Sequence, residues 1–285
     1  MLINDEIGEG ENMKIGLALG GGGARGIAHL GVWLRLQELG IPIHCIAGTS
    51  IGAIAGAIIA AGRVDAALAW CAEPDWKKLP KLVFGNRFSS KALMQGRRVE
   101  ELLAELIGAQ DFADLSMPFA AVATDLNSGE AVTMREGDLL SAVRASMSIP
   151  GIFRPVERQG RVLVDGQLVD PVPVAACRAM GADKVIAVDI NPPSPTFAGK
   201  PWKKVNIMDV LVGTLSIFNW EITRRAFAEN RPDVLIRPQV GDVWALDFRH
   251  ADRLVEIGWK AVSDSLVEKL EAGKSGNPGN SGKSG

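Results

Sequence analysis

The chain has 285 residues, of which 47% are hydrophobic and 22% are charged, and its formal net charge is −2. This composition is sufficient for a large core and excludes a globally disordered chain. Phosphate binding needs clustered Lys and Arg, and the chain has no long basic run, which argues against nucleic acid as the main partner.

The predicted elements alternate between strands and helices. In chain order they are a strand at Lys14–Leu19, a helix at Ala24–Leu39, a strand at Ile43–Ala47, a helix at Ile51–Ala61, mostly helical residues at 64–107, strands at Phe119–Thr124, Ala131–Met134, Arg161–Val164 and Lys184–Val188, a helix at about 205–228, a strand at Val234–Ile236 and a helix at about 248–270. Several of the strands are continuous apolar runs, which fit a sheet covered on both faces. The alternation therefore predicts an α/β fold built in layers.

The cysteines and the lengths of the apolar runs indicate in which cellular compartment the protein works. Cys45, Cys71 and Cys177 are odd in number and lack C-x-x-C spacing, which argues against a disulfide framework or a zinc site and is typical of a reducing compartment. Residues 1–12 have no basic start and no apolar core, so they lack the pattern of a signal peptide. The longest apolar stretch, Ile51–Ala61, is shorter than the roughly 20 residues that span a bilayer. We therefore expect a cytoplasmic protein.

The first motif is the glycine-rich segment Gly20–Gly26, between an expected strand and an expected helix. Its backbone N–H groups have no side chains in front of them and can bind an anion. Gly21, Gly23 and Gly26 match the dinucleotide pattern G-x-G-x-x-G, but the next strand ends without the acidic residue that this pattern requires. No Lys-Ser/Thr follows, so a P-loop is not matched either. An oxyanion hole is the functional interpretation that fits, and a tight turn is the structural alternative.

The second motif is Gly48-Thr49-Ser50-Ile51-Gly52, a G-x-S-x-G between a strand and a helix, as in a nucleophile elbow. A Cβ at either glycine would crowd the sharp turn, and the helix N-terminus adds positive potential for developing negative charge. A serine that caps the helix after a glycine turn is the alternative. If the sheet is parallel, this motif and the glycine loop both lie at its carboxyl edge, where ligands bind.

A histidine base has little support in the sequence. His29 lies one turn into the first helix, and His44 lies in the strand before the elbow. His250 comes after Ser50, so the order Ser…Asp…His is available, but it opens the last helix, where solvated histidines are common.

A carboxylate is the other candidate base. Asp125, Asp165 and Asp189 each end an apolar strand, so each could face the same edge of the sheet. Asp165 is followed by Gly166, and an Asp-Gly turn is its structural alternative. Spacing does not choose among the three. A solvated aspartate has a pKa near 3.9 and is a weak base, so the base must be buried, which raises the pKa.

Together these segments resemble the motifs of the patatin-like phospholipases. Gly20–Gly26 resembles their G-G-G-x-R-G segment, Gly48–Gly52 their G-x-S-x-G, and Asp165-Gly166 their D-G-G/A. Ala145–Phe153 is similar to the segment that precedes the aspartate in this family. The resemblance covers roughly residues 14–190, with four motifs in the family's order.

The resemblance implies a three-layer α/β/α sandwich with a mainly parallel central sheet, a catalytic dyad of Ser50 and Asp165 without histidine, and hydrolysis of fatty acyl esters of lipids. No metal or cofactor is implied. The implied oxyanion hole lies on the backbone of Gly21, Gly22 and Gly23, with Arg25 bracing the loop. The supporting motif glycines are Gly20, Gly26, Gly48, Gly52 and Gly166. Gln167 departs from the family's usual small residue, which bears on the shape of the pocket.

The expected organisation is a flexible leader at 1–12, a patatin-like hydrolase domain at 13–272 and a disordered tail at 273–285. Within the domain, 14–190 is the motif core and 200–272 is a helical C-terminal extension. Trp76–Phe84 mixes aromatic and basic residues, as do segments at the surface of the inner membrane, although a lid or a solvated loop fits equally well. A lipid acyltransferase and a non-catalytic regulatory protein are the alternative functions. The oligomeric state is not indicated.

Overall fold

The computed structural model describes residues 13–72, 91–191, 205, 207–241, 243, 244, 247–266, 268 and 270, without the side chains of 91–98, 208 and 212. Three predictions lie outside these residues: the leader at 1–12, the segment Trp76–Phe84 and the tail at 273–285. The glycine loop, the elbow and the three candidate carboxylates all lie within them.

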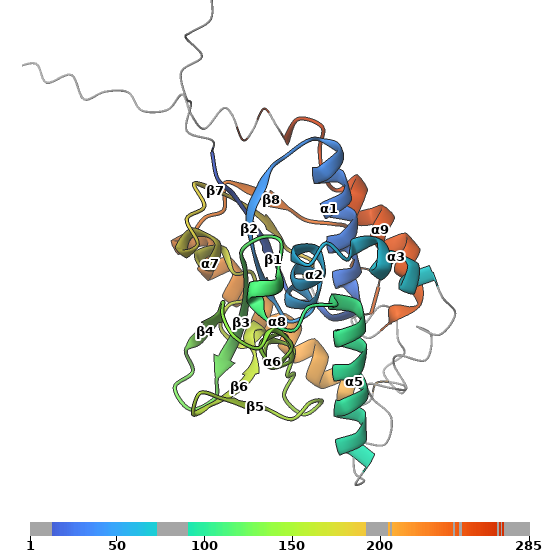
Figure 1. The fold of residues 1–285 in the computed structure, drawn as a ribbon, viewed down its shortest axis with the longest axis vertical. Coiled ribbons are helices and arrows are strands. Elements are labelled where there is room, and N and C mark those ends of the chain that lie inside the picture. The colour runs from blue at the N-terminus through green and yellow to red at the C-terminus, as the bar shows by residue number, and fades with distance from the viewer. Residues whose placement is uncertain are drawn as a thin grey trace, which may run out of the picture.

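A mixed eight-stranded sheet forms the centre of the described fold (Figure 1). Its strands are β1 (Ile15–Leu19), β2 (Ile43–Thr49), β3 (Phe119–Asp125), β4 (Ala131–Met134), β5 (Val156–Arg158), β6 (Arg161–Asp165), β7 (Lys184–Val188) and β8 (Val234–Ile236). The path through the sheet is β5-β6-β3-β2-β1-β7-β8, with β4 paired to β3. The neighbours from β3 to β8 along this path are parallel, and β4, β5 and β6 pair in antiparallel fashion. The continuous apolar runs of β1, β3 and β7 are buried, as expected for parallel strands covered on both faces.

Helices cover both faces of the sheet, which confirms the three-layer α/β/α sandwich (Figure 1). The helices are α1 (Ala28–Glu38), α2 (Ile51–Ala60), α3 (Val64–Ala72), α5 (Lys91–Ile107), α6 (Leu139–Ser146), α7 (Val174–Ala179), α8 (Ile207–Glu229) and α9 (Ala251–Lys260). Short 3₁₀ segments are η1 (Gly23–Ile27), η3 (Phe112–Asp114), η4 (Gly166–Leu168) and η6 (Phe248–His250). Helix α7 lies on one face, where Phe227 of α8 also packs, and α1, α2 and α9 lie on the other. No helix of the described residues combines the length and apolarity needed to cross a membrane.

The C-terminal helix α9 packs directly on α1 through glycines. A Cβ at Gly31 would overlap the carbonyl oxygen of Val255, and a Cβ at Gly258 would overlap that of Ala28. At each contact the glycine of one helix lies against a backbone carbonyl of the other, so the two backbones touch. This contact attaches the C-terminal extension to the helix that follows the glycine loop.

The structure differs from the sequence prediction in several elements. β5, α6 and α7 were not predicted. The helix expected at Ala24–Leu39 begins as the 3₁₀ segment η1 and becomes α-helical at Ala28. The helix expected at about 248–270 also begins as a 3₁₀ segment, and α9 ends at Lys260. The Ser263 side chain then accepts a hydrogen bond from the Ser265 amide, a local bond that competes with helical pairing.

Candidate active site

Ser50 occupies the corner between β2 and α2. Its backbone has φ 57° and ψ −122°, a left-handed conformation that is strained for a residue with a side chain. The flanking glycines allow close approach: a Cβ at Gly48 would overlap the carbonyl oxygen of Gly52, and a Cβ at Gly52 would overlap that of Leu19. Helix α2 thus starts against the end of β1, as a nucleophile elbow requires.

Ser50 and Asp165 are in direct contact. The Ser50 hydroxyl donates a hydrogen bond of 2.6 Å to Oδ2 of Asp165, and both residues are buried. The other carboxylate oxygen, Oδ1, accepts a hydrogen bond of 2.9 Å from the backbone N–H of Gln167. Burial raises the pKa of Asp165 to about 7, although the hydrogen bonds from Ser50 and Gln167 act in the opposite direction. The carboxyl group therefore changes its protonation near neutral pH, where a general base is most useful.

The registers of β2 and β6 along β3 explain how these two residues meet. The last residue of β2, Thr49, pairs with Val122 of β3, and the last residue of β6, Asp165, pairs with the next residue of β3, Ala123. The residues that flank β3 at its two ends are both even-numbered, and each bonds to one of these strands. Ile46 N–H of β2 donates to Pro118 O, and Leu126 N–H donates to Val162 O of β6. Backbone groups of alternate residues point to opposite edges of a strand, so β2 and β6 share one edge of β3. Running in opposite directions, they end facing each other.

Gly166 allows this close meeting of the strand ends. A Cβ at Gly166 would overlap the Val122 carbonyl oxygen and lie 3.0 Å from Cγ2 of Thr49. The Asp-Gly sequence is therefore needed at this corner because the chain passes directly over the end of β2.

Ser146 holds the elbow in place and was not singled out from the sequence. Its hydroxyl accepts the Ser50 amide at 2.9 Å and donates to the Val122 carbonyl at 2.6 Å. Ser146 is fully buried at the end of α6 and connects Ser50 to β3. Its segment, Ala145–Phe153, was noted only as a stretch similar to the family, because a serine in a helical pattern gives no local signal of this role.

The other two candidate carboxylates are held in ion pairs away from Ser50. Asp125 contacts Nη1 of Arg161 at 3.4 Å, and Asp189 accepts Nε of Arg237 at 3.1 Å. Asp189 also accepts a hydrogen bond from the backbone N–H of Asn191. Of the three aspartates that spacing left equivalent, the structure brings Asp165 to the elbow.

The histidines have other positions. His29 is fully buried, and its Nε2 donates to the Gly20 carbonyl at 2.7 Å, which braces the glycine loop. Burial lowers the pKa of His29 to about 4, so its ring is neutral. His250 lies 3.5 Å from Asp247 on the surface, and His44 lies in β2 before the elbow.

The glycine loop is fixed from several sides. The Gly20 amide donates to Val188 O and the Gly21 amide to Pro171 O, each at 3.0 Å. The Gly21 amide is thus already used within the protein, which narrows the predicted oxyanion donors to Gly22 and Gly23. Neither of those two amides has an acceptor in the part of the chain that the structure describes.

Two side chains complete the surroundings of the loop. Arg25 is buried, and its Nε donates to the Val243 carbonyl at 2.7 Å, so it links the loop to the C-terminal part of the chain. The Gln167 side chain lies directly over Gly21, where any Cβ would overlap it. The unusual glutamine therefore fills the space above the glycine loop instead of leaving it open.

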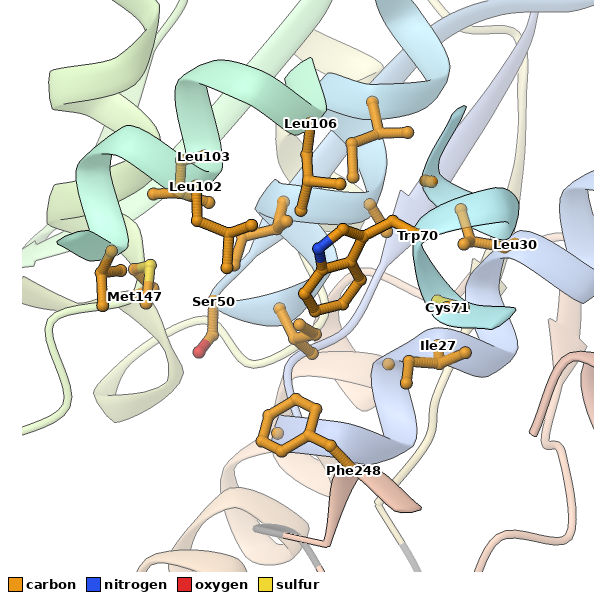
Figure 2. Close-up of a pocket in the computed structure, with 18 of the residues that line it drawn as sticks. Ile27, Leu30, Ser50, Trp70, Cys71, Leu102, Leu103, Leu106, Met147 and Phe248 are labelled. Carbon is orange, nitrogen blue, oxygen red and sulfur yellow. The ribbon is translucent and has the colours of Figure 1, made fainter. Parts of the chain in front are cut away.

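An apolar cavity of about 150 Å³ opens beside Ser50 (Figure 2). Ser50 and Met147 lie at one end, and Trp70 and Cys71 lie across the cavity. Aliphatic side chains of α5 form one wall, and Phe248 closes another. A second cavity, of about 50 Å³, has Asp165 and Gln167 in its lining. Ser50 therefore borders an apolar space, and Asp165 borders a more polar one.

Comparison with known proteins identifies the class to which this fold and site belong. Residues 17–178 match the family model described as Patatin-like phospholipase. The chain belongs to the patatin-like phospholipase family. The structure of VipD from Legionella pneumophila covers 92% of this chain with a TM-score of 0.50 at 14% sequence identity, and this chain covers 67% of VipD. That likeness supports the fold.

Among curated relatives, an uncharacterized NTE family protein of Mycobacterium tuberculosis is 39% identical over 178 residues, which are 62% of this chain and 49% of the relative. A second one from that organism is 32% identical over 271 residues, 89% of this chain and 46% of the relative. Patatin-like phospholipase domain-containing protein 7 of Rattus norvegicus is 29% identical over 271 residues, 86% of this chain and 20% of the relative. The chain spans half or less of the length of these relatives.

Proposed function

We propose that the protein hydrolyses fatty acyl esters of lipids through an acyl-enzyme on Ser50, with Asp165 as the base. The observation that carries this proposal is the 2.6 Å hydrogen bond between the Ser50 hydroxyl and a buried Asp165 whose pKa is raised to about 7. An ionised Asp165 accepts the hydroxyl proton while the serine oxygen attacks the ester carbonyl carbon. The carboxyl group then donates that proton to the alcohol oxygen as the carbon–oxygen bond breaks.

The glycine loop stabilises the negative charge that forms on the carbonyl oxygen. The amides of Gly22 and Gly23 are the donors that this proposal assigns to the oxyanion hole. One such donor is worth roughly 3–4 kcal/mol of transition-state stabilisation in other hydrolases. The loop needs no movement to act, because His29 and Asn191 hold the carbonyls of Gly20 and Gly21.

The apolar cavity receives the acyl chain. Its walls are aliphatic and aromatic side chains, which favour burial of a hydrocarbon chain from water. After the alcohol leaves, water attacks the acyl-enzyme, and Asp165 accepts a proton from that water. Asp165 then donates that proton to the serine oxygen as the bond between this oxygen and the acyl carbon breaks, and the fatty acid leaves.

A fluorophosphonate probe and a series of p-nitrophenyl esters test this proposal. Wild type should be labelled and should hydrolyse the esters, and Ser50→Ala should do neither. Absence of labelling in folded wild type would favour a non-catalytic regulatory protein. Transfer of the acyl group to an added alcohol in preference to water would favour a lipid acyltransferase.

A cytoplasmic location and peripheral contact with a lipid surface remain parts of the proposal. Helix α8 supports such contact, since Ile207, Ile217 and Phe218 are more than half exposed on it. Sedimentation with lipid vesicles checks this point: Phe218→Ser should bind less than wild type, and equal binding would contradict it.

A further inference from the structure

The second cavity, called here the polar cavity, adjoins the acyl-chain cavity. The two cavities share Gly23 and Ile149 in their linings, but Ser50 lines the apolar one and Asp165 lines the polar one. The polar cavity is about 50 Å³, against the roughly 10–15 Å³ that one water molecule needs. It therefore has room for a polar group of several heavy atoms.

The proposed chemistry places the alcohol portion of the ester in this cavity. The leaving alcohol oxygen must receive a proton, and Asp165 is the group that carries one after Ser50 has attacked. The alcohol oxygen must therefore lie on the Asp165 side, while the acyl chain extends into the cavity beside Ser50. The substituents of the alcohol then extend into the polar cavity.

Helix α8 closes this cavity and places Asn219 in its lining. Leu215, Ser216 and Asn219 are the residues of α8 that line it. Asn219 is 5% exposed, and its Oδ1 atom has no hydrogen-bond partner in the described part of the chain. A buried polar atom without a partner costs free energy, and a ligand that supplies the partner recovers it.

A hydroxyl group fits this position better than a charged group. A hydroxyl both donates and accepts, so it pairs with the amide of Asn219 in either orientation of that amide. A phosphate only accepts, and the ionised Asp165 in the same lining would repel it. The guanidinium in the lining, Arg25, already donates to the Val243 carbonyl.

We infer that the polar cavity lined by α8 binds the alcohol portion of the ester and that Asn219 hydrogen-bonds a hydroxyl carried by that alcohol, as on the glycerol unit of an acylglycerol. The inference rests on the proposed function. It adds a substrate-binding residue outside the stretch 17–178 that matches the family.

A matched pair of substrates tests the inference on wild type. The 1-monoglyceride and the n-propyl ester of one fatty acid differ only by two hydroxyl groups, and their rates of alkaline hydrolysis correct for intrinsic reactivity. Wild type should prefer the monoglyceride about five- to tenfold in kcat/KM, the effect of one hydrogen bond to an uncharged group. Equal corrected rates would overturn the inference. The 1-acyl lysophosphatidylcholine of the same chain distinguishes a neutral from a zwitterionic alcohol, and the cavity favours the neutral one.

Asn219→Leu and Thr223→Val form a matched pair of variants. Thr223 lies one turn farther along α8, and its Oγ1 atom is also buried without a partner among the described residues, but it does not line the cavity. Asn219→Leu should lose the monoglyceride preference while still hydrolysing the propyl ester and reacting with the fluorophosphonate. Thr223→Val should keep the preference. Asn219→Ala repeats the test with a smaller side chain in case the leucine variant does not fold.

The outcomes separate this inference from the proposed function. Loss of both substrates in equal proportion in both Asn219 variants would assign Asn219 a purely structural role and overturn the inference. An unchanged preference in a folded Asn219 variant would also overturn it. Wild type that hydrolyses neither ester and takes no probe would refute the proposed function itself, and the inference with it.

Discussion

The corner where β2 meets β6 and the C-terminal helices α8 and α9 build the site in different ways. At the corner, short hydrogen bonds between buried groups fix Ser50 and Asp165 at neighbouring registers of β3. The C-terminal helices supply none of these bonds, but they place Asn219 in the polar cavity and pack on α1 through glycines. The two proposed reacting groups thus come from the part that matches the family, and part of the cavity walls comes from residues beyond it.

The strongest test of the corner is Asp165→Asn. Loss of the base should lower kcat/KM by roughly 10²–10⁴-fold, because general-base catalysis contributes on this scale. The variant should also be more stable than wild type at pH 8, where the native carboxylate is ionised and buried, and the difference should be smaller at pH 5. Thermal unfolding at both pH values and ester hydrolysis measure the two effects.

Asp125→Asn is the control for that variant, since Asp125 ends a neighbouring strand and pairs with Arg161. Its activity should stay within about twofold of wild type. Should Asp125→Asn be inactive while Asp165→Asn is active, the assignment of the base would be wrong.

The pH dependence of wild type is the next largest effect. Asp165 accepts the serine proton only when ionised, and its pKa is about 7. Activity as kcat/KM should therefore fall about tenfold for each pH unit below 7 and be roughly level above it. The same raised pKa makes the contribution of Asp165 to stability greatest at acidic pH and lost as the pH rises through 7. A rate that is level down to pH 5 would show that a different group is the base.

Gly258→Ala tests the packing of the C-terminal helices. In an exposed helix this change would stabilise by up to about 1 kcal/mol. Here the added Cβ would overlap the Ala28 carbonyl oxygen, so we expect a loss of about 2–3 kcal/mol in the free energy of unfolding. Urea denaturation measures it, with Lys260→Ala on the exposed face of α9 as a control that should change by less than about 0.5 kcal/mol. A stabilised Gly258→Ala would contradict the close contact.

Ser146→Ala should have the smallest effect and refines the description of the corner. It removes the bridge from the Ser50 amide to the Val122 carbonyl and leaves both buried groups without that partner. We expect a loss of about 1–2 kcal/mol in stability and a roughly tenfold slower reaction with the fluorophosphonate. Ser128→Ala, which changes an exposed hydroxyl, should do neither. Equal labelling rates would mean that the elbow keeps its shape without the bridge.

Much of the sheet could be predicted because its strands are uninterrupted apolar runs. Strands β4, β7 and β8 have the predicted bounds, β1, β3 and β6 differ from them by one residue, and β2 differs by two. By contrast, β5 contains one apolar residue, Val156, and α7 has six residues, so neither shows a period. Helix α6 has a local signal that was not used: Asp138 caps it by accepting the Ser141 amide.

The site could be predicted only as far as its motifs. The elbow and the glycine loop each have local signatures, but the pairing of Ser50 with Asp165 depends on the register of two strands against a third. Local patterns do not contain that register, so residue types alone left Asp125 and Asp189 as equal candidates. Asn219 had no signal at all, because an asparagine in a long helix is ordinary until its surroundings are known.

The meeting of two strand ends on one edge of β3 has a consequence for how this protein can vary. Loops between β3 and β6, such as the turn between β3 and β4, can lengthen or shorten without moving the dyad, provided that β6 and Ser146 return to the same positions. A slip of β6 by a single residue would instead turn the carboxylate to the opposite face of the sheet, since side chains alternate along a strand. Insertions in these loops should therefore be tolerated, whereas an insertion that shifts the pairing of β6 with β3 should abolish the site.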